Sequence, residues 1–168
     1  GRVSPEAAGF RLREYRAEFD FVAALQALAN APDVGQVLAN AEPQFFHYKL
    51  LKDALARYRK VAQQPQRGQL PGVQRPLKAG SSYAGSPVLR KFLSATGDLP
   101  PGSDVSSEDL EFDAPLSGAV RTFQLRHGLE QNGQINKATL AAMNAPPAQL
   151  LRKIELTLER WRWLTPFK

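Results

Sequence analysis

The chain lacks cysteine and contains very little histidine or methionine. Its 168 residues include two histidines, His47 and His127, and one methionine, Met143. Without cysteine, the chain cannot form disulfides, thiolate metal sites or a cysteine nucleophile. A zinc site would have to be built mainly from carboxylates, which is an uncommon ligand set. We therefore expect no catalytic residue, no metal site and no cofactor within this sequence.

Long apolar runs are also absent. No window approaches the roughly 18 consecutive apolar residues that a membrane-spanning helix needs, and no signal peptide is visible in the sequence. The apolar fraction of 43% and the charged fraction of 23% are those of an ordinary globular protein. We expect the chain to be a piece of a larger protein, with any membrane attachment of that protein outside this sequence.

The net charge of +6 is distributed unevenly. Residues 1–75 carry 11 Lys/Arg against 7 Asp/Glu (+4), residues 76–145 carry 6 against 7 (−1), and residues 146–168 carry 5 against 2 (+3). A nucleic-acid-binding domain usually concentrates basic residues on the element that reads the polymer. Because the segment that most resembles a helix–turn–helix lies in the net-negative part, we expect no nucleic-acid partner.

Apolar residues recur every three or four positions in the first part of the chain, which predicts three helices. The first covers 19–29. It cannot extend past Pro32, because proline cannot continue a helix. The second begins at Val34 and ends before Pro43. The third, 48–62, has a basic outer face, which is typical of a helix that packs on its neighbours. Its apolar positions are Tyr48, Leu51, Leu55, Tyr58 and Ala62.

Residues 63–85 indicate a connector, because they contain three prolines, four glycines and little periodicity. So long a loop is unusual inside one compact domain, and we therefore place a domain boundary near residue 76. The expected fold is all-α: a helical scaffold domain at 1–75, and a three-helix module at 76–145 inserted into it. Residues 146–168 are expected to pack back on the scaffold.

Three helices are predicted in the module. The first covers 86–97, where Ser-Pro suits a helix start and glycine suits a left-handed cap. The second covers 114–127, and the third begins near Asn136. Between the first two, the acidic segment 98–111 is expected to be an exposed loop. The Gln-Asn-Gly sequence at 131–133 predicts a tight turn, because Asn-Gly readily supplies a positive φ angle.

A last helix is predicted over 148–164, directly after two prolines. Its apolar residues at Leu151, Ile154, Leu158 and Trp161 form one stripe, which should face the scaffold helices. Trp163 lies two positions further and faces another direction. We expect it to pack on a domain outside this sequence; the alternative is that it lies exposed in this chain.

The most specific pattern lies at 119–144, AVRTFQLRHGLEQNGQINKATLAAMN. It resembles small peptidoglycan-binding-like modules, whose pattern is A-V-x-x-F-Q-x-x-x-G-L-x-x-x-G, then a threonine and a closing L-N. This chain has Asn136-Lys137 where the family often has Gly-Pro, and Met143 before the closing asparagine. The matching residues are Ala119, Val120, Phe123, Gln124, Gly128, Leu129, Gly133, Thr139 and Asn144.

The flanks resemble the large murein L,D-transpeptidases. The similar stretches are GRVSP at the start, EPQFFHYKLLKDALARYR at 42–59 and LLRKIELTLERWRWL at 150–164. In that family a scaffold domain and an inserted module precede a catalytic domain with a cysteine nucleophile and an activating histidine. The resemblance implies that this chain is a non-catalytic, by itself inactive region of a periplasmic enzyme. Its implied partners are peptidoglycan, through glycan or stem peptide, and the parent's own C-terminal catalytic domain.

If the module binds the wall polymer, polar side chains off the core face are the candidates. Arginine can pair with stem carboxylates, and amides can bond sugar hydroxyls or peptide groups. His127, at a helix end, fits a cap-region role better than an acid–base role. The candidate ligand-binding residues are Arg121, Gln124, Arg126, His127, Asn132, Gln134 and Asn136.

Three functional hypotheses follow. In the first, the chain positions an L,D-transpeptidase on peptidoglycan. In the second, the module is a structural insertion that braces the catalytic domain and binds no wall polymer, since a fold does not by itself imply a function. In the third, which the charge distribution disfavours, the chain is a small basic nucleic-acid binder.

Overall fold

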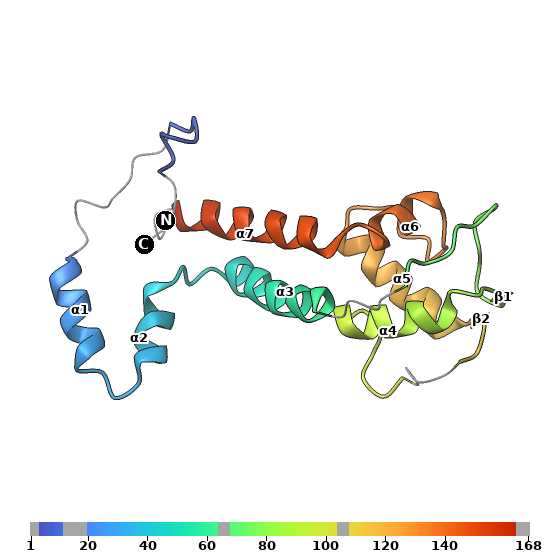
Figure 1. Cartoon of the computed structure of the whole chain (residues 1–168), viewed down its shortest axis with the longest axis horizontal. Coiled ribbons are helices and arrows are strands. Elements are labelled where there is room, and N and C mark those ends of the chain that lie inside the picture. Colours follow the sequence, from blue (N-terminus) through green and yellow to red (C-terminus); the bar gives the residue numbers. More distant parts are fainter. Residues whose placement is uncertain (1–3, 12–19, 64–67, 104–107, 164–168) are drawn as a thin grey trace. The chain divides into compact units, whose positions relative to one another are not determined.

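The computed structural model describes residues 4–11, 20–63, 68–103 and 108–163. These residues form helices and one pair of two-residue strands (Figure 1), so the predicted all-α class is confirmed. None of the helices in the described ranges is long and apolar enough to cross a membrane. The elements are α1 (Phe21–Ala29), α2 (Val34–Ala41), α3 (Phe46–Ala62), β1 (Ser81–Ser82), α4 (Ser86–Thr96), β2 (Glu111–Phe112), α5 (Ala114–Arg126), α6 (Lys137–Met143) and α7 (Pro147–Trp163).

The chain divides into two compact units. Unit 1 comprises residues 1–53 and 153–168, and unit 2 comprises residues 54–152. The division falls within α3 and within α7. The domain boundaries near residues 75 and 145 that the sequence suggests stay a prediction.

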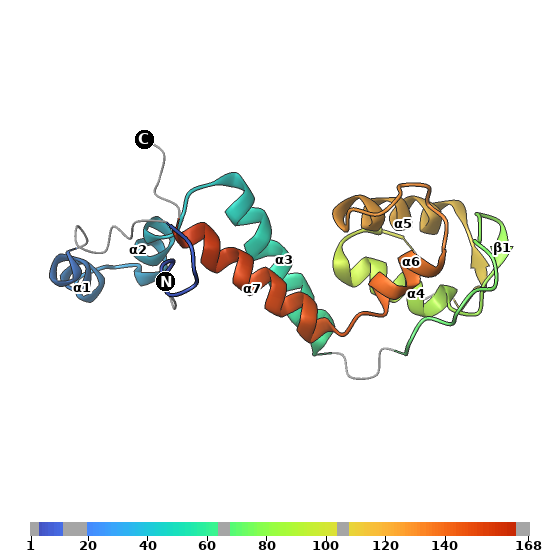
Figure 2. The same cartoon turned by 90° about the horizontal axis from the view of Figure 1, so that it is seen from above.

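In unit 1, α1 and α2 lie side by side (Figures 1 and 2). Each begins at an aspartate whose carboxylate accepts a backbone N–H of the first turn: Asp20 from Ala23 at 2.9 Å, and Asp33 from Gln36 at 3.1 Å. Both predicted helices are thereby confirmed. Among the described residues, neither helix buries a side chain. Their exposed large apolar side chains are Phe21, Val22, Leu25, Val34 and Leu38.

The first turns of α3 and the last turns of α7 pack together in unit 1. The buried Tyr48 accepts a hydrogen bond on its phenol oxygen from Arg162 Nε at 2.9 Å. The same guanidinium lies over the Tyr48 ring, 5.8 Å from the ring centroid. Trp161 is half-buried and packs on Phe45, with ring centroids 5.3 Å apart. These contacts join the start of α3 to the end of α7, two segments that lie more than 100 residues apart in the sequence.

The core of unit 2 lies between α4, α5 and α6 (Figure 2). The predicted inward residues Leu116, Val120 and Phe123 of α5 are fully buried, as is Met143 of α6 at 1% exposure. Asn136 caps α6 by accepting the N–H of Thr139 at 2.9 Å. The three predicted helices of this region are confirmed.

The start of α4 differs from the prediction by one residue. Gly85, and not Ser86, is the N-cap, and no side chain caps this helix. The hydroxyl of Ser86 instead donates to the carbonyl of Leu110 at 3.3 Å. The end of the helix agrees with the prediction, because Gly97 adopts a left-handed φ of 76°.

Part of the predicted connector belongs to this core. Leu70 and Tyr83 are buried, and Leu77 forms a backbone bridge to Ile135. Strand β1 pairs antiparallel with β2, which places Ser81 opposite Phe112. A two-residue strand is too short to produce a periodic pattern, so the sequence did not reveal it.

The predicted exposed loop at 98–111 is wrong at both ends, and residues 104–107 lie outside the described part. Asp98 is 5% exposed and Leu99 4% exposed, because they fold back under the end of α4. At the other end, Glu111 and Phe112 form β2, with Phe112 fully buried. A buried aspartate requires a partner, and Arg126 supplies it in the site described next.

Candidate functional site

The loop between α5 and α6 is held in place by the fully buried side chain of Gln124. Its amide nitrogen donates to Asn132 Oδ1 at 3.2 Å, to the carbonyl of Gln134 at 3.1 Å and to Thr139 Oγ1 at 3.0 Å. Its amide oxygen accepts the N–H of Gly133 at 2.9 Å. The expectation that Gln124 lies off the core face is therefore wrong: it fills the space between two helices and their loop.

Gly133 brings the loop against α5. Its φ of 67° confirms the predicted turn, and a Cβ atom at this position would lie 2.8 Å from Ser117 Oγ and 2.9 Å from the Ser117 carbonyl oxygen. The Ser117 hydroxyl donates to the carbonyl of Gly133 at 2.9 Å. Only glycine combines this close approach with a left-handed backbone.

The two asparagines of the loop present their amide nitrogens to solvent. Asn132 Oδ1 accepts the backbone N–H of Gln134 at 2.9 Å, and Asn136 Oδ1 accepts that of Thr139 at 2.9 Å. Because a backbone N–H can only donate, these bonds fix which end of each side chain is the oxygen. The NH₂ groups, which carry two donors each, point away from the bonds that hold the loop.

Arg121 is exposed on the face of α5 that meets this loop. It follows Ser117 by four positions and precedes Gln124 by three, so the three residues share one helical face. Ser117 and Gln124 both bond to the loop. Arg121 therefore emerges beside residues 131–134.

Three basic residues of residues 76–145 are ion-paired and three are not. Arg90 pairs with Asp113, Lys91 with Glu108, and Arg126 with Asp98. Within the part of the chain that the structure describes, the remaining cations have no ion-pair partner. These unpaired cations are Lys78, Arg121 and Lys137.

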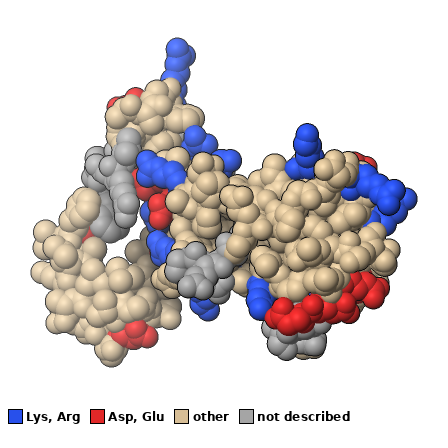
Figure 3. Space-filling view, turned by 45° about the vertical axis from the view of Figure 1, so that its right-hand side comes forward, with Lys and Arg blue, Asp and Glu red and all other residues tan. Residues whose placement is uncertain are grey.

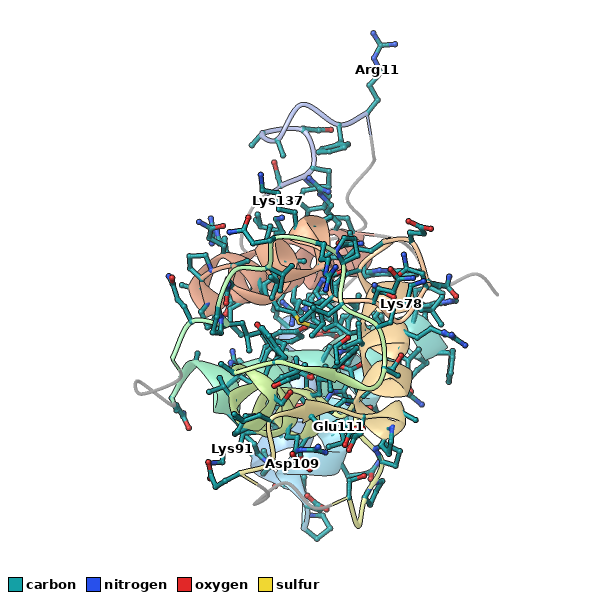
Figure 4. All side chains as sticks on the ribbon, turned by 90° about the vertical axis from the view of Figure 1, so that its right-hand side faces the viewer. Arg11, Lys78, Lys91, Asp109, Glu111 and Lys137 are labelled. Carbon is teal, nitrogen blue, oxygen red and sulfur yellow. The ribbon has the colours of Figure 1, made fainter. Side chains whose placement is uncertain are left out.

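The unpaired cations gather around the loop. Lys78 follows Leu77, which bridges Ile135, and Lys137 lies two residues after Ile135. Figure 4 shows Lys78 and Lys137 above Lys91, Asp109 and Glu111 in that view. Acidic side chains form a band along the lower edge of the same unit in Figure 3. We call the surface of Lys78, Arg121, Asn132, Gln134, Asn136 and Lys137 the loop surface.

Arg126 and His127 lie elsewhere, at the end of α5 that meets α3. Arg126 forms two hydrogen bonds to Asp98, Nε to Oδ1 at 2.8 Å and Nη2 to Oδ2 at 2.5 Å, and the Asp98 side chain is fully buried. Nε2 of His127 lies 2.9 Å from the hydroxyl oxygen of Tyr58, and the His127 ring stacks on Phe123 with centroids 4.0 Å apart. His127 is the C-cap of α5, which agrees with the expected cap-region role.

The pKa values of two residues in this second cluster, Arg126 and Tyr58, are raised above their ordinary values. Burial lowers the pKa of Arg126, but the hydrogen bonds and charge of Asp98, together with Tyr58, outweigh it and raise the pKa above the ordinary arginine value. Burial raises the pKa of Tyr58. Arg126 is therefore a cation that is already paired with the buried Asp98. It is less able than Arg121 to bind an external anion.

The structure therefore divides the seven predicted residues. Arg121, Asn132, Gln134 and Asn136 lie at the loop surface, Gln124 lies beneath it, and Arg126 and His127 belong to the contact with α3. Sequence reasoning missed Lys137, although it directly follows the candidate Asn136. It also missed Lys78, because only the long-range bridge of Leu77 to Ile135 brings this residue to the loop. Whether these residues bind a ligand stays a prediction. No group of three or more metal-ligating side chains occurs among the described residues.

Two family models match parts of this chain. Residues 87–143 match the family model "Putative peptidoglycan binding domain", and residues 1–55 match the family model "Scaffold domain". No curated protein matches the chain. The first match covers α4, α5, α6 and the loop between α5 and α6. This region is therefore similar to peptidoglycan-binding domains, a similarity that indicates peptidoglycan as a partner and the cell envelope as the place of action.

Proposed function

We propose that this chain is the non-catalytic region of a periplasmic L,D-transpeptidase and that its module holds the enzyme on peptidoglycan. The observation that carries the wall-binding part is the loop surface, whose residues other than Lys78 lie within the matched region. The loop surface combines three unpaired cations with outward-facing amide donors, and its nearest acidic residue in sequence is Glu130. Asp109 and Glu111 lie below Lys78 and Lys137 in the view of Figure 4. An uneven distribution of positive and negative charge orients a protein on an anionic polymer.

Support for a further domain comes from the exposed apolar face of α1 and α2. Phe21 is 61% exposed, Leu25 66% and Leu38 53%, and residues 21–41 contain a single charged residue, Asp33. Exposed apolar patches of this kind mark interaction surfaces. We propose that the catalytic domain of the parent enzyme covers this face.

Trp163 supports the same arrangement. It is half-buried and packs on Phe10, with ring centroids 5.5 Å apart, while Phe10 itself is 43% exposed. The buried indole N–H of Trp163 has no hydrogen-bond partner among the described residues. Because Phe10 and part of Trp163 remain accessible, we propose that they extend the apolar surface that the catalytic domain covers.

The wall-binding part is tested by sedimentation of the chain with insoluble sacculi. We expect retention of the chain, weaker retention of the Arg121→Gln variant, and unchanged retention of Arg152→Gln, a variant at an exposed arginine on α7 outside the loop surface. No retention of the unaltered chain would favour the alternative, a structural insertion that braces the catalytic domain.

The transpeptidase part is tested on the full-length parent polypeptide. Cross-linking of peptide stems should require a cysteine outside this chain, because none of the 168 residues is cysteine. Alkylation of thiols should therefore abolish cross-linking and leave retention on sacculi intact. Cross-linking that survives complete alkylation would contradict the proposal.

A further inference from the structure

We propose that the loop surface recognises a carboxylate of the peptide stems and not the glycan strand. This inference rests on the proposed wall binding and specifies the chemical group that is bound. It follows from the hydrogen bonds of the loop. Some of its donor and acceptor atoms are bonded within the fold, and the others are left for a ligand.

The loop uses its acceptor atoms internally. Asn132 Oδ1 accepts two hydrogen bonds, from Gln124 and Gln134, and Asn136 Oδ1 accepts one from Thr139. The carbonyl oxygens of Gly133 and Gln134 accept from Ser117 and Gln124. The donors left for a ligand are the NH₂ groups of Asn132 and Asn136 and the guanidinium of Arg121. The side-chain amides of Gln131 and Gln134, which can donate as well as accept, lie beside them in the sequence.

The charge of the surface favours an anion. Lys78, Arg121 and Lys137 contribute three positive charges, and the exposed Glu130 at the start of the loop contributes one negative charge, which leaves +2. The other arginines of residues 76–145, Arg90 and Arg126, are already paired with buried or half-buried carboxylates. Arg121 is therefore the guanidinium that can bind an external carboxylate with two parallel hydrogen bonds.

A neutral glycan suits this surface poorly. Sugar hydroxyls donate as well as accept, so they require acceptor atoms, and sugar ring faces pack on aromatic side chains. Residues 129–137 contain no aromatic residue, and the side-chain oxygens of Asn132 and Asn136 already accept hydrogen bonds from within the fold. A carboxylate, which only accepts, matches a surface of donors and cations.

The inference is tested by titrating the full chain with three soluble probes: the free stem tetrapeptide, the same peptide with its carboxyl groups converted to amides, and chitotetraose. We expect the free tetrapeptide to bind, and the amidated peptide and chitotetraose to bind at least about tenfold more weakly, a difference of about 1.4 kcal/mol. Arg121→Gln should weaken tetrapeptide binding by a similar factor, whereas Arg152→Gln should not. Equal binding of the amidated peptide, or preferential binding of chitotetraose, would overturn the inference.

A second experiment separates this inference from the proposed function and remains informative if single stems bind weakly. Retention is measured on intact sacculi and on glycan strands from which an amidase has removed the stems, with the lactyl carboxylates that this cleavage exposes converted to neutral amides. Retention on intact sacculi alone supports both proposals. Equal retention on both materials overturns the carboxylate inference but leaves wall binding in place, and no retention on either overturns wall binding itself.

Discussion

The amide nitrogen of Gln124 lies 3.0 Å from the hydroxyl oxygen of Thr139, and both residues are buried. This contact joins α5 to α6, and the same side chain holds the backbone of Gly133 between them. The exposed loop surface thus stands on a buried polar network. A network of this kind stabilises one conformation only when its members are satisfied, so the shape of the loop depends on a residue that does not face the ligand.

The first prediction concerns this network. Gln124→Ala removes both the donor and the acceptor that hold the loop and leaves the N–H of Gly133 without its partner. We expect a loss of about 2–4 kcal/mol in the free energy of unfolding, measured by urea denaturation. Arg121→Ala, at an exposed position on the same helix, should change the unfolding free energy by no more than about 0.5 kcal/mol. Equal losses in the two variants would show that Gln124 does not hold the loop.

The second prediction compares two glycines with similar backbones. Gly133 has φ of 67° and Gly128 has φ of 64°, but only Gly133 has atoms within 4 Å of the position of an added Cβ. Gly128→Ala should therefore cost only the left-handed backbone penalty, about 1–2 kcal/mol. Gly133→Ala should cost roughly 1–3 kcal/mol more, because Ser117 has to move. Thermal unfolding of both variants checks the order, and a smaller loss for Gly133→Ala would contradict the described packing.

The third prediction concerns stability at alkaline pH. Burial raises the pKa of Tyr83 to about 12, against about 10 for an unfolded tyrosine, and its hydroxyl donates to the carbonyl of Pro71 at 2.9 Å. The folded chain keeps this proton at a pH where the unfolded chain loses it. The contribution of the Tyr83 phenol to the free energy of unfolding is therefore fully present below about pH 10, and it is lost as the pH rises towards about 12.

The measurement for this third prediction is urea denaturation across that pH range. The unfolding free energy of the unaltered chain should fall with rising pH more steeply than that of Tyr83→Phe, which has no phenol to ionise. Parallel curves for the two proteins would rule out Tyr83 as a source of the alkaline dependence.

The fourth prediction concerns the apolar face of α1 and α2. Because Leu25 and Leu38 are largely exposed, replacing both by aspartate should change the unfolding free energy of the isolated chain by no more than about 0.5 kcal/mol per site. In the full-length parent, where we propose that the catalytic domain covers this face, the same change should lower the melting temperature and increase proteolysis between the domains. Leu125→Asp, at an exposed leucine of α5, is the matched control and should have neither effect.

Local pattern was sufficient to predict the helices of this protein. The three- and four-residue spacing around Phe123, and the stop at Gly97, depend on neighbours within a few positions, and the structure agrees with both. Long-range pairs were not predictable in this way. The bridge of Leu77 to Ile135 and the ion pair of Asp98 with Arg126 join residues far apart in sequence.

The same distinction applies to the candidate site. Arg121, Asn132, Gln134 and Asn136 were predicted as polar side chains off the core face, and none of the four is buried. Gln124 was assigned to the wrong face, because a polar residue is usually placed at the surface, and only its four hydrogen bonds reveal why it is buried. Lys78 was not among the predicted site residues, because the prolines and glycines around it predict a connector.

The most direct test of the central claim is the fraction of the chain retained by purified sacculi at low and at high salt, with Arg121→Gln and Arg152→Gln measured in parallel. We predict retention that weakens as salt screens the cations of the loop surface, that falls several-fold in Arg121→Gln, and that stays unchanged in Arg152→Gln. Absence of retention at low salt, or an equal loss in both variants, would contradict a specific wall-binding surface at the loop.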